Sequence, residues 1–152
     1  MEKSLNEKLS NLNEFRTKLE NTVFKNLSQN VRSALSSLFL TYVLAKADKV
    51  SPGITKLKLN FIELTNGIVL ILPRYNKKCD SVTIYGDKFQ TNARSVFAAV
   101  CANVYKIFSE IPNLPKNDTL ELIRIHGDTI LGIDKCKDLK GIKVEDFMMM
   151  VD

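Results

Sequence analysis

The sequence contains no tryptophan, one histidine and three cysteines among 152 residues. Histidine is the side chain that changes charge near neutral pH, so a single His126 cannot build a His-rich metal cluster. An odd number of cysteines without a CxxC pair argues against a disulfide scaffold and a zinc finger. We expect Cys79, Cys101 and Cys136 to be reduced thiols, in the cytoplasm or in another reducing intracellular compartment.

Long apolar runs are also missing. The most apolar run, residues 68–72, falls far short of the roughly 18 apolar residues that a membrane helix needs. The first 15 residues interleave charged and amide side chains, where a secretory signal would carry an apolar run of roughly 7–15 residues. The sequence therefore predicts neither a membrane span nor a secretory signal.

Motifs that carry known chemistries are absent as well. The chain has no GxxxxGK[ST], GxGxxG, GxSxG or HExxH pattern. Its aspartates fall at predicted turns and strand ends, where aspartate is common because it bonds its own backbone. We therefore expect no catalytic residue, no metal site and no cofactor, and predict that the protein is not an enzyme. Two residual candidates are His126, at a predicted hairpin tip, and the thiols of Cys79 and Cys136, whose lysine neighbours would lower a thiol pKa.

What is present is typical of a globular domain. Hydrophobic residues make up 45% of the chain and charged residues 26%, and 22 Lys and Arg against 17 Asp and Glu leave a formal charge of +5. The length suits one domain over residues 1–152, since domains cluster at roughly 100–150 residues. Within it, residues 1–25 are candidates for a protruding or oligomerising helix.

The N-terminal half predicts helices. Apolar residues recur every three or four positions over residues 2–25, the stripe of an amphipathic helix, and polar residues 26–30 then interrupt it. Ser28 or Asn30 is a plausible cap for a second helix with a wide apolar stripe, which ends at the Ser51-Pro52-Gly53 turn. The first stripe consists of Leu5, Leu9, Leu12, Phe15, Leu19 and Val23.

The pattern then predicts three strands. Alternation over residues 56–61 indicates a half-buried strand, and the Asn66-Gly67 pair favours a hairpin into the wholly apolar segment 68–72. Residues 82–85 are predicted as a third strand that ends at Gly86-Asp87. A strongly apolar helix follows over residues 92–111, with Thr91 or Asn92 as its cap, and ends at Pro112.

Two more strands are predicted at residues 120–125 and 130–133, joined by a turn at Gly127-Asp128. A lysine-rich link then leads to a short helix around residues 147–151. The fold class is therefore α+β: a long N-terminal helix or helix pair, then β-β-β-α-β-β-α, with helices packed on a largely antiparallel five-stranded sheet. This order is similar to that of small dimeric secretion chaperones and of small basic RNA-binding modules, which implies architecture alone.

Basic loops suggest the first functional hypothesis, a non-enzymatic protein that binds RNA or DNA. Lysine and arginine can meet phosphates, and an exposed aromatic can stack on a base. One candidate loop holds Tyr75 among its cations, and the second follows residue 134; the strand at 56–58 adds two further lysines. The predicted nucleic-acid-binding residues are Arg74, Tyr75, Lys77, Lys78, Lys135, Lys137 and Lys140.

A surplus of apolar surface suggests the second hypothesis, a protein-interaction adaptor or chaperone-like dimer with a protein partner. One sheet has little area to cover the N-terminal stripe, the 92–111 helix and the Met148–Met150 tail together. A small domain gains stability by burying such a stripe against a second copy, so we expect a homodimer. The predicted oligomer interface is Leu5, Leu9, Leu12, Phe15 and Leu19.

Overall fold

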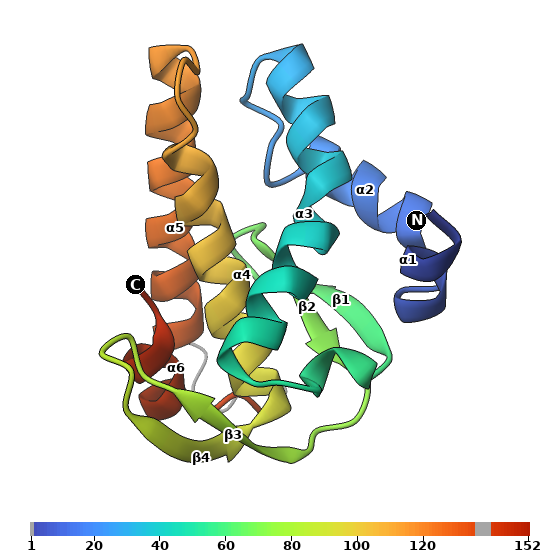
Figure 1. The fold of residues 1–152 in the computed structure, drawn as a ribbon. Coiled ribbons are helices and arrows are strands. Elements are labelled where there is room, and N and C mark those ends of the chain that lie inside the picture. Colours follow the sequence, from blue (N-terminus) through green and yellow to red (C-terminus); the bar gives the residue numbers. More distant parts are fainter. Residues whose placement is uncertain (1, 136–140) are drawn as a thin grey trace.

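The computed structural model describes residues 2–135 and 141–152 (Figure 1). The chain runs through α1 (Glu2–Lys8), α2 (Leu12–Asn21), α3 (Gln29–Val50), the short 3-10 helix η1 (Ile54–Lys56), β1 (Leu59–Glu63), β2 (Val69–Pro73), β3 (Lys78–Val82), β4 (Lys88–Asn92), α4 (Ala93–Ser109), α5 (Lys116–Lys135) and α6 (Val144–Met150). Within these residues, no helix is both long enough and apolar enough to cross a membrane.

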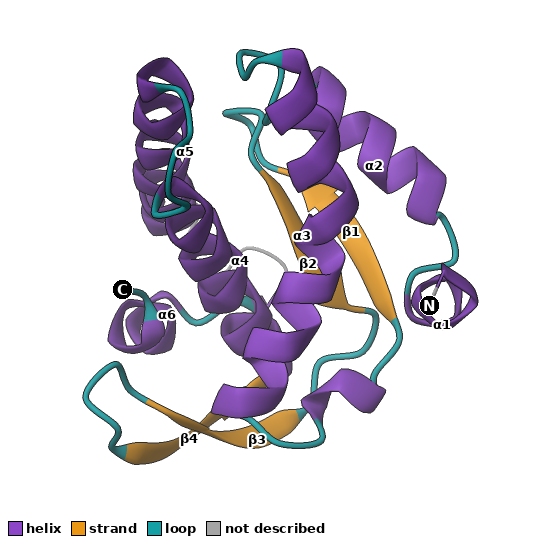
Figure 2. Ribbon diagram, turned by 45° about the horizontal axis from the view of Figure 1, so that its top comes forward, coloured by secondary structure: helices purple, strands orange, loops and turns teal. Residues whose placement is uncertain are grey.

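The fold is α+β, but the predicted five-stranded sheet is wrong. The described residues form two separate antiparallel hairpins, β1–β2 and β3–β4, which Figure 2 shows as two pairs of arrows. In β1–β2, Leu59 pairs with Pro73 and Glu63 with Val69. Every residue of β2 is buried, as its apolar sequence predicts.

The predicted fourth and fifth strands are a single helix, α5. Its buried residues Leu122, Ile125, Thr129 and Ile133 recur every three or four positions, the spacing of one helical face. Exposed apolar residues between them imitate the alternation of strands. Gly127-Asp128 is not a turn, because the helix continues through it at the cost of roughly 0.5–1 kcal/mol for an interior glycine.

The third predicted strand is displaced. Residues 83–87 form the turn of the β3–β4 hairpin, where the Thr83 hydroxyl oxygen accepts hydrogen bonds from the amides of Tyr85 and Asp87, each at 3.2 Å. Asn92 is the cap of α4, as predicted: its side-chain oxygen accepts a hydrogen bond from the Ser95 amide at 2.9 Å. The C-terminal helix is also present, as α6.

The N-terminal stripe lies inside the protein rather than on its surface. Leu5, Leu9, Leu12, Phe15 and Leu19, the residues predicted to form an oligomer interface, are all buried within the chain. The stripe runs through α1, the connection that holds Leu9, and α2. Phe15 packs its ring 6.1 Å from Phe39 in α3 and 5.3 Å from Phe61 in β1. This packing within one chain leaves the stripe without the exposed area that a second copy would need.

Helix α4 is the centre of the core, because it packs against α3, α5, α6 and β2. Of its 17 residues, 13 are buried. The Tyr105 ring stacks on Phe39 at 4.7 Å, and its hydroxyl donates to the Val69 carbonyl at 2.7 Å. This core fixes α3 and the two hairpins relative to one another, so that the lower end of the α3 helix in Figure 1 meets both the β2–β3 connection and β3.

Candidate nucleic-acid interface

The predicted basic loop is an exposed connection between β2 and β3 with an anchored backbone. Arg94, in the first turn of α4, donates from its guanidinium to the carbonyls of Pro73 at 3.2 Å and Arg74 at 2.8 Å. The Asn76 side-chain oxygen accepts a hydrogen bond from the Arg94 amide at 3.2 Å. The side chains of residues 74–78 are therefore presented from a fixed backbone, which reduces the entropy lost when they bind a ligand.

Three lysines from two segments meet at a cavity of about 470 Å³ beside this connection. Lys77 and Lys78 line it from the connection and the start of β3, and Lys56 lines it from η1. Asp80 also lines the cavity and offsets part of this charge. Within the part of the chain that the structure describes, none of the three lysines forms an ion pair. The apolar walls come from Pro52, Ile54, Leu57 and Ala93.

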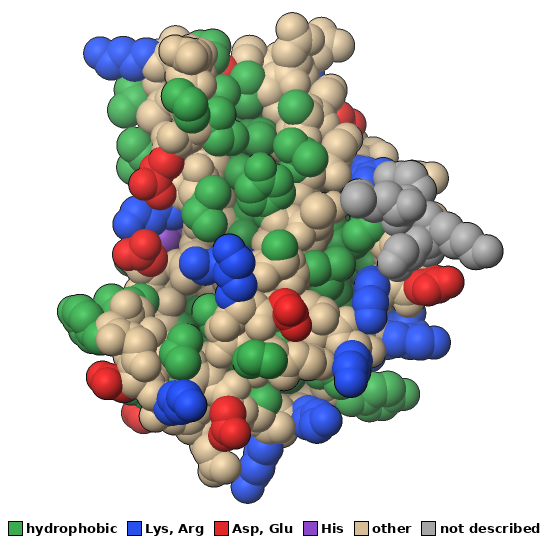
Figure 3. Space-filling model, viewed as in Figure 1, with side chains coloured by type: hydrophobic (Ala, Val, Ile, Leu, Met, Phe, Trp, Pro, Cys, Tyr) green, Lys and Arg blue, Asp and Glu red, His purple; other side chains and the backbone are tan. Residues whose placement is uncertain are grey.

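Two further cations continue this surface along the first hairpin. The Arg74 amide donates to the Lys58 carbonyl at 2.8 Å, which extends the β1–β2 pairing by one step and places Lys58 beside Arg74. The Arg74 guanidinium also donates to the Ser10 hydroxyl at 3.1 Å. We call this surface the basic end, and Figure 3 shows Lys and Arg side chains gathered at the lower right of that view. It consists of Lys56, Lys58, Arg74, Lys77 and Lys78.

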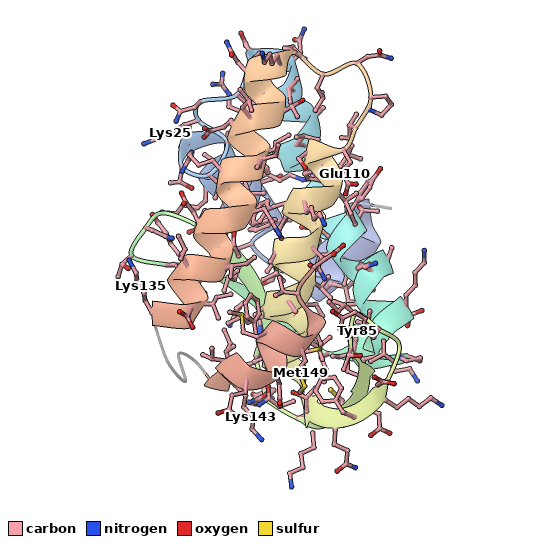
Figure 4. All side chains as sticks on the ribbon, turned by 90° about the vertical axis from the view of Figure 1, so that its left-hand side faces the viewer. Lys25, Tyr85, Glu110, Lys135, Lys143 and Met149 are labelled. Carbon is pink, nitrogen blue, oxygen red and sulfur yellow. The ribbon has the colours of Figure 1, made fainter. Side chains whose placement is uncertain are left out.

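Tyr75 stands within the basic end with 80% of its surface exposed. An aromatic side chain so open to solvent buries almost no apolar area in the fold, and its ring is free to stack on a ligand. Tyr85 is equally open but lies in the β3–β4 turn, which Figure 4 places near Met149 of α6. Tyr75 is therefore the exposed tyrosine of the β2–β3 connection, two residues before the cavity-lining Lys77.

The second predicted basic loop joins the first only in part. Lys135 ends α5 about one helical turn after Gly132, and a Cβ built on Gly132 would lie 2.9 Å from the Asn66 side-chain nitrogen in the β1–β2 turn. That turn is at the far end of the hairpin from Lys58 and Arg74, so Lys135 is not part of the basic end. Lys137 and Lys140 lie outside the described residues. Gly141, which follows them, lies at the β2–β3 connection, because the Asn76 side chain donates to the Gly141 carbonyl at 3.3 Å.

The site therefore contains two lysines that the predicted set omitted, Lys56 and Lys58. A signal for them existed in the sequence. A hairpin centred on Asn66-Gly67 pairs Leu59 with Pro73, and one more step places Lys58 beside Arg74.

Among the described residues, His126 and the thiols of Cys79 and Cys101 each interact with groups of the protein itself. His126 lies within α5 and not at a hairpin tip, and its ring nitrogens contact the carbonyls of Ala102 at 2.7 Å and Asp152 at 2.9 Å. Burial raises the pKa of the Cys79 thiol and outweighs the opposite effect of Lys77, so the predicted lowering is wrong. Burial also raises the pKa of Cys101 to about 12, and this thiol lies in the core as a small apolar residue. Cys136 lies outside the described residues.

A metal centre is not evident either: the described part of the chain holds no group of three His, Cys, Asp or Glu side chains placed to bind an ion. No protein-family model and no curated protein sequence matches the chain.

Proposed function

We propose that the protein is a non-enzymatic nucleic-acid-binding protein that holds single-stranded RNA or DNA at the basic end. One observation carries this proposal: Lys56, Lys77 and Lys78 line one cavity of about 470 Å³, and the exposed Tyr75 lies two residues before Lys77 in the same connection. Lysine ammonium groups that lack a protein counter-ion attract phosphates, and releasing the condensed counter-ions of the nucleic acid drives binding.

The shape of the site favours a single strand over a duplex. The cavity lies within the range of roughly 300–1,000 Å³ that small-molecule sites occupy, and its walls are partly apolar. An unpaired base can enter such a cavity while its flanking phosphates meet the lysines at the rim. Tyr75 can stack on the next base, an interaction that duplex bases, already stacked on each other, do not offer.

Removing two charges from the basic end tests the proposal. We expect Lys77→Gln/Lys78→Gln to weaken binding to a labelled random-sequence single strand about tenfold at moderate salt. Each phosphate contact in a single strand contributes about 0.7 to the slope of log affinity against log salt, so this variant should lower the slope by about 1.4. Fluorescence anisotropy over a salt series measures both quantities.

The matched control removes two charges from the opposite end of α3. That helix has 22 residues and so spans about 33 Å between its ends. Lys25→Gln/Arg32→Gln should leave the slope unchanged, because neither residue lies at the basic end. An unchanged slope in Lys77→Gln/Lys78→Gln, or an equal loss in the control, would refute the assignment of the site.

One exposed apolar cluster supports the alternative function, a protein-interaction adaptor. The β3–β4 turn and α6 expose apolar side chains next to each other, since the Ile84 amide donates to the Met149 carbonyl at 3.0 Å. An exposed cluster of this kind suits contact with a protein partner. Absence of nucleic-acid binding at low salt, where the electrostatic attraction is strongest, would favour this alternative. The cluster consists of Ile84, Tyr85, Met148 and Met149.

A further inference from the structure

Helix α5 carries an exposed apolar stripe along the side opposite to its core face. Leu120, Ile123 and Leu131 are 53%, 52% and 55% exposed, although each is a large aliphatic side chain. Gly127 lies between them, and a Cβ built on it would meet nothing within 4 Å. Figure 4 looks onto the side of the molecule along which α5 runs. Three such side chains on one helix form a surface that gains free energy when it is covered.

The spacing of this stripe is that of a helix–helix seam. Starting at Lys116, successive steps of four and three residues lead through Leu120, Ile123 and Gly127 to Ile130, which is half-buried and also packs against the core, and then to Asp134. Alternating steps of four and three are typical of the positions at which two helices pack along their length. Leu131 borders the seam. Arg124 lies at its edge and is held there by ion pairs to Glu121 and Asp128, which leave the apolar centre free of charge.

The two ends of the seam carry opposite charges. Lys116 begins α5 and Asp134 lies one residue before its end; both are exposed, and neither forms an ion pair among the described residues. An antiparallel pair of these helices places each Lys116 beside the other copy's Asp134. A parallel pair would instead set lysine against lysine and aspartate against aspartate.

The same antiparallel register matches the apolar positions. It sets Leu120 against the other copy's Ile130 and Ile123 against the other copy's Gly127. Because glycine has no side chain, the space above it can receive the isoleucine, in the manner of a knob entering a hole. A two-fold axis through the middle of the helix makes each of these contacts twice.

We propose that α5 is the contact surface for a second copy of this chain, joined as an antiparallel helix pair. A helix of 20 residues is about 30 Å long, so one helix pair buries an area at the low end of stable interfaces. The expected dimer is therefore weak, with a dissociation constant in the micromolar range. It does not depend on the basic end, which lies on other elements of the fold.

Sedimentation velocity of the full chain over a concentration series tests this interface. The wild type should shift from monomer to dimer with rising concentration, and Ile123→Glu should weaken association tenfold or more. Leu38→Glu is the matched control, because Leu38 is similarly exposed but lies on α3. A wild type that stays monomeric at millimolar concentration, or equal effects of the two substitutions, would overturn the proposal.

A charge exchange tests the antiparallel register and does not rely on Ile123→Glu remaining folded. Lys116→Asp alone should weaken the dimer, because it sets two carboxylates against each other at each end. Lys116→Asp combined with Asp134→Lys should restore dimerisation to within a few-fold of the wild type. The two positions are separated by most of the length of α5, so a direct contact within one chain cannot produce this rescue. Failure of the double variant to recover would refute the register.

Discussion

Replacing Phe39 with alanine is expected to lower the free energy of unfolding by about 3–5 kcal/mol, the usual cost of deleting a buried phenyl ring. Phe39 is fully buried in α3 and stacks on Tyr105 of α4 at 4.7 Å. Its ring also lies 6.1 Å from Phe15, 6.4 Å from Phe24 and 6.2 Å from Phe108. Phe24 also packs its ring against Tyr105 and Phe108, which restricts how far these three rings can move into the cavity that the substitution leaves. Urea denaturation followed by circular dichroism measures the loss.

Leu38→Ala is the control for this substitution. Leu38 is the preceding residue of the same helix, but 42% of its surface is exposed. Its replacement should cost less than about 1 kcal/mol, since surface substitutions change stability little. Equal losses at the two positions would contradict the arrangement in which α2, α3 and α4 share one aromatic core.

Asp118→Ala is expected to cost about 1.5–3 kcal/mol, the range for hydrogen bonds to a charged group. Asp118 lies buried in the first turn of α5 and accepts two hydrogen bonds from Ser28, from its amide at 2.9 Å and from its hydroxyl at 2.6 Å. Ser28 caps the N-terminus of α3, and its own side chain makes no capping bond there. The carboxylate therefore satisfies an amide at the start of α3 and joins that helix to α5.

Two further variants separate this contact from a general effect of substitution. Asp118→Asn retains one acceptor oxygen and should lose less stability than Asp118→Ala. Asn117→Ala, at the exposed neighbouring position, should stay within about 0.5 kcal/mol of the wild type. Denaturation midpoints rank the three variants, and an Asp118→Ala midpoint equal to that of the wild type would refute the contact.

The sequence predicted correctly those elements whose residue pattern is compatible with only one local structure. The Asn66-Gly67 turn between an alternating and a wholly apolar segment predicts the β1–β2 hairpin. Asn92 before an apolar helix predicts the start of α4. In both cases the side chain or turn acts on its own backbone, so the information is contained within a few residues.

Helix α5 was mispredicted because it is apolar on two faces. Leu122 and Ile125 face the core while Leu120 and Ile123 face solvent, so apolar residues on both faces fall into two short runs that imitate two strands. Gly127-Asp128 then resembles a turn. The prediction for the N-terminal stripe was wrong for a different reason. Periodicity indicates that Leu9 and the other apolar residues of the stripe are buried, but it does not say whether their own chain or a second copy covers them.

The basic end was partly predictable. Arg74, Tyr75, Lys77 and Lys78 are contiguous and polar after a buried strand, which predicts an exposed loop. Adding Lys58 requires only the register of one hairpin. Adding Lys56 requires the position of η1 relative to β3, which depends on how α3 packs on α4 and has no signature in the local sequence.

Amide chemical shifts of the full-length ¹⁵N-labelled protein, titrated with a short single-stranded oligonucleotide at low salt, test the central claim most directly. We predict that the largest shifts fall on residues 56–58 and 74–78, with little change over residues 25–32 at the other end of α3. A dilution series without oligonucleotide is the control, because any shift that depends on protein concentration alone reports self-association. An absence of shifts at low salt, or shifts confined to the β3–β4 turn and α6, would contradict nucleic-acid binding at the basic end.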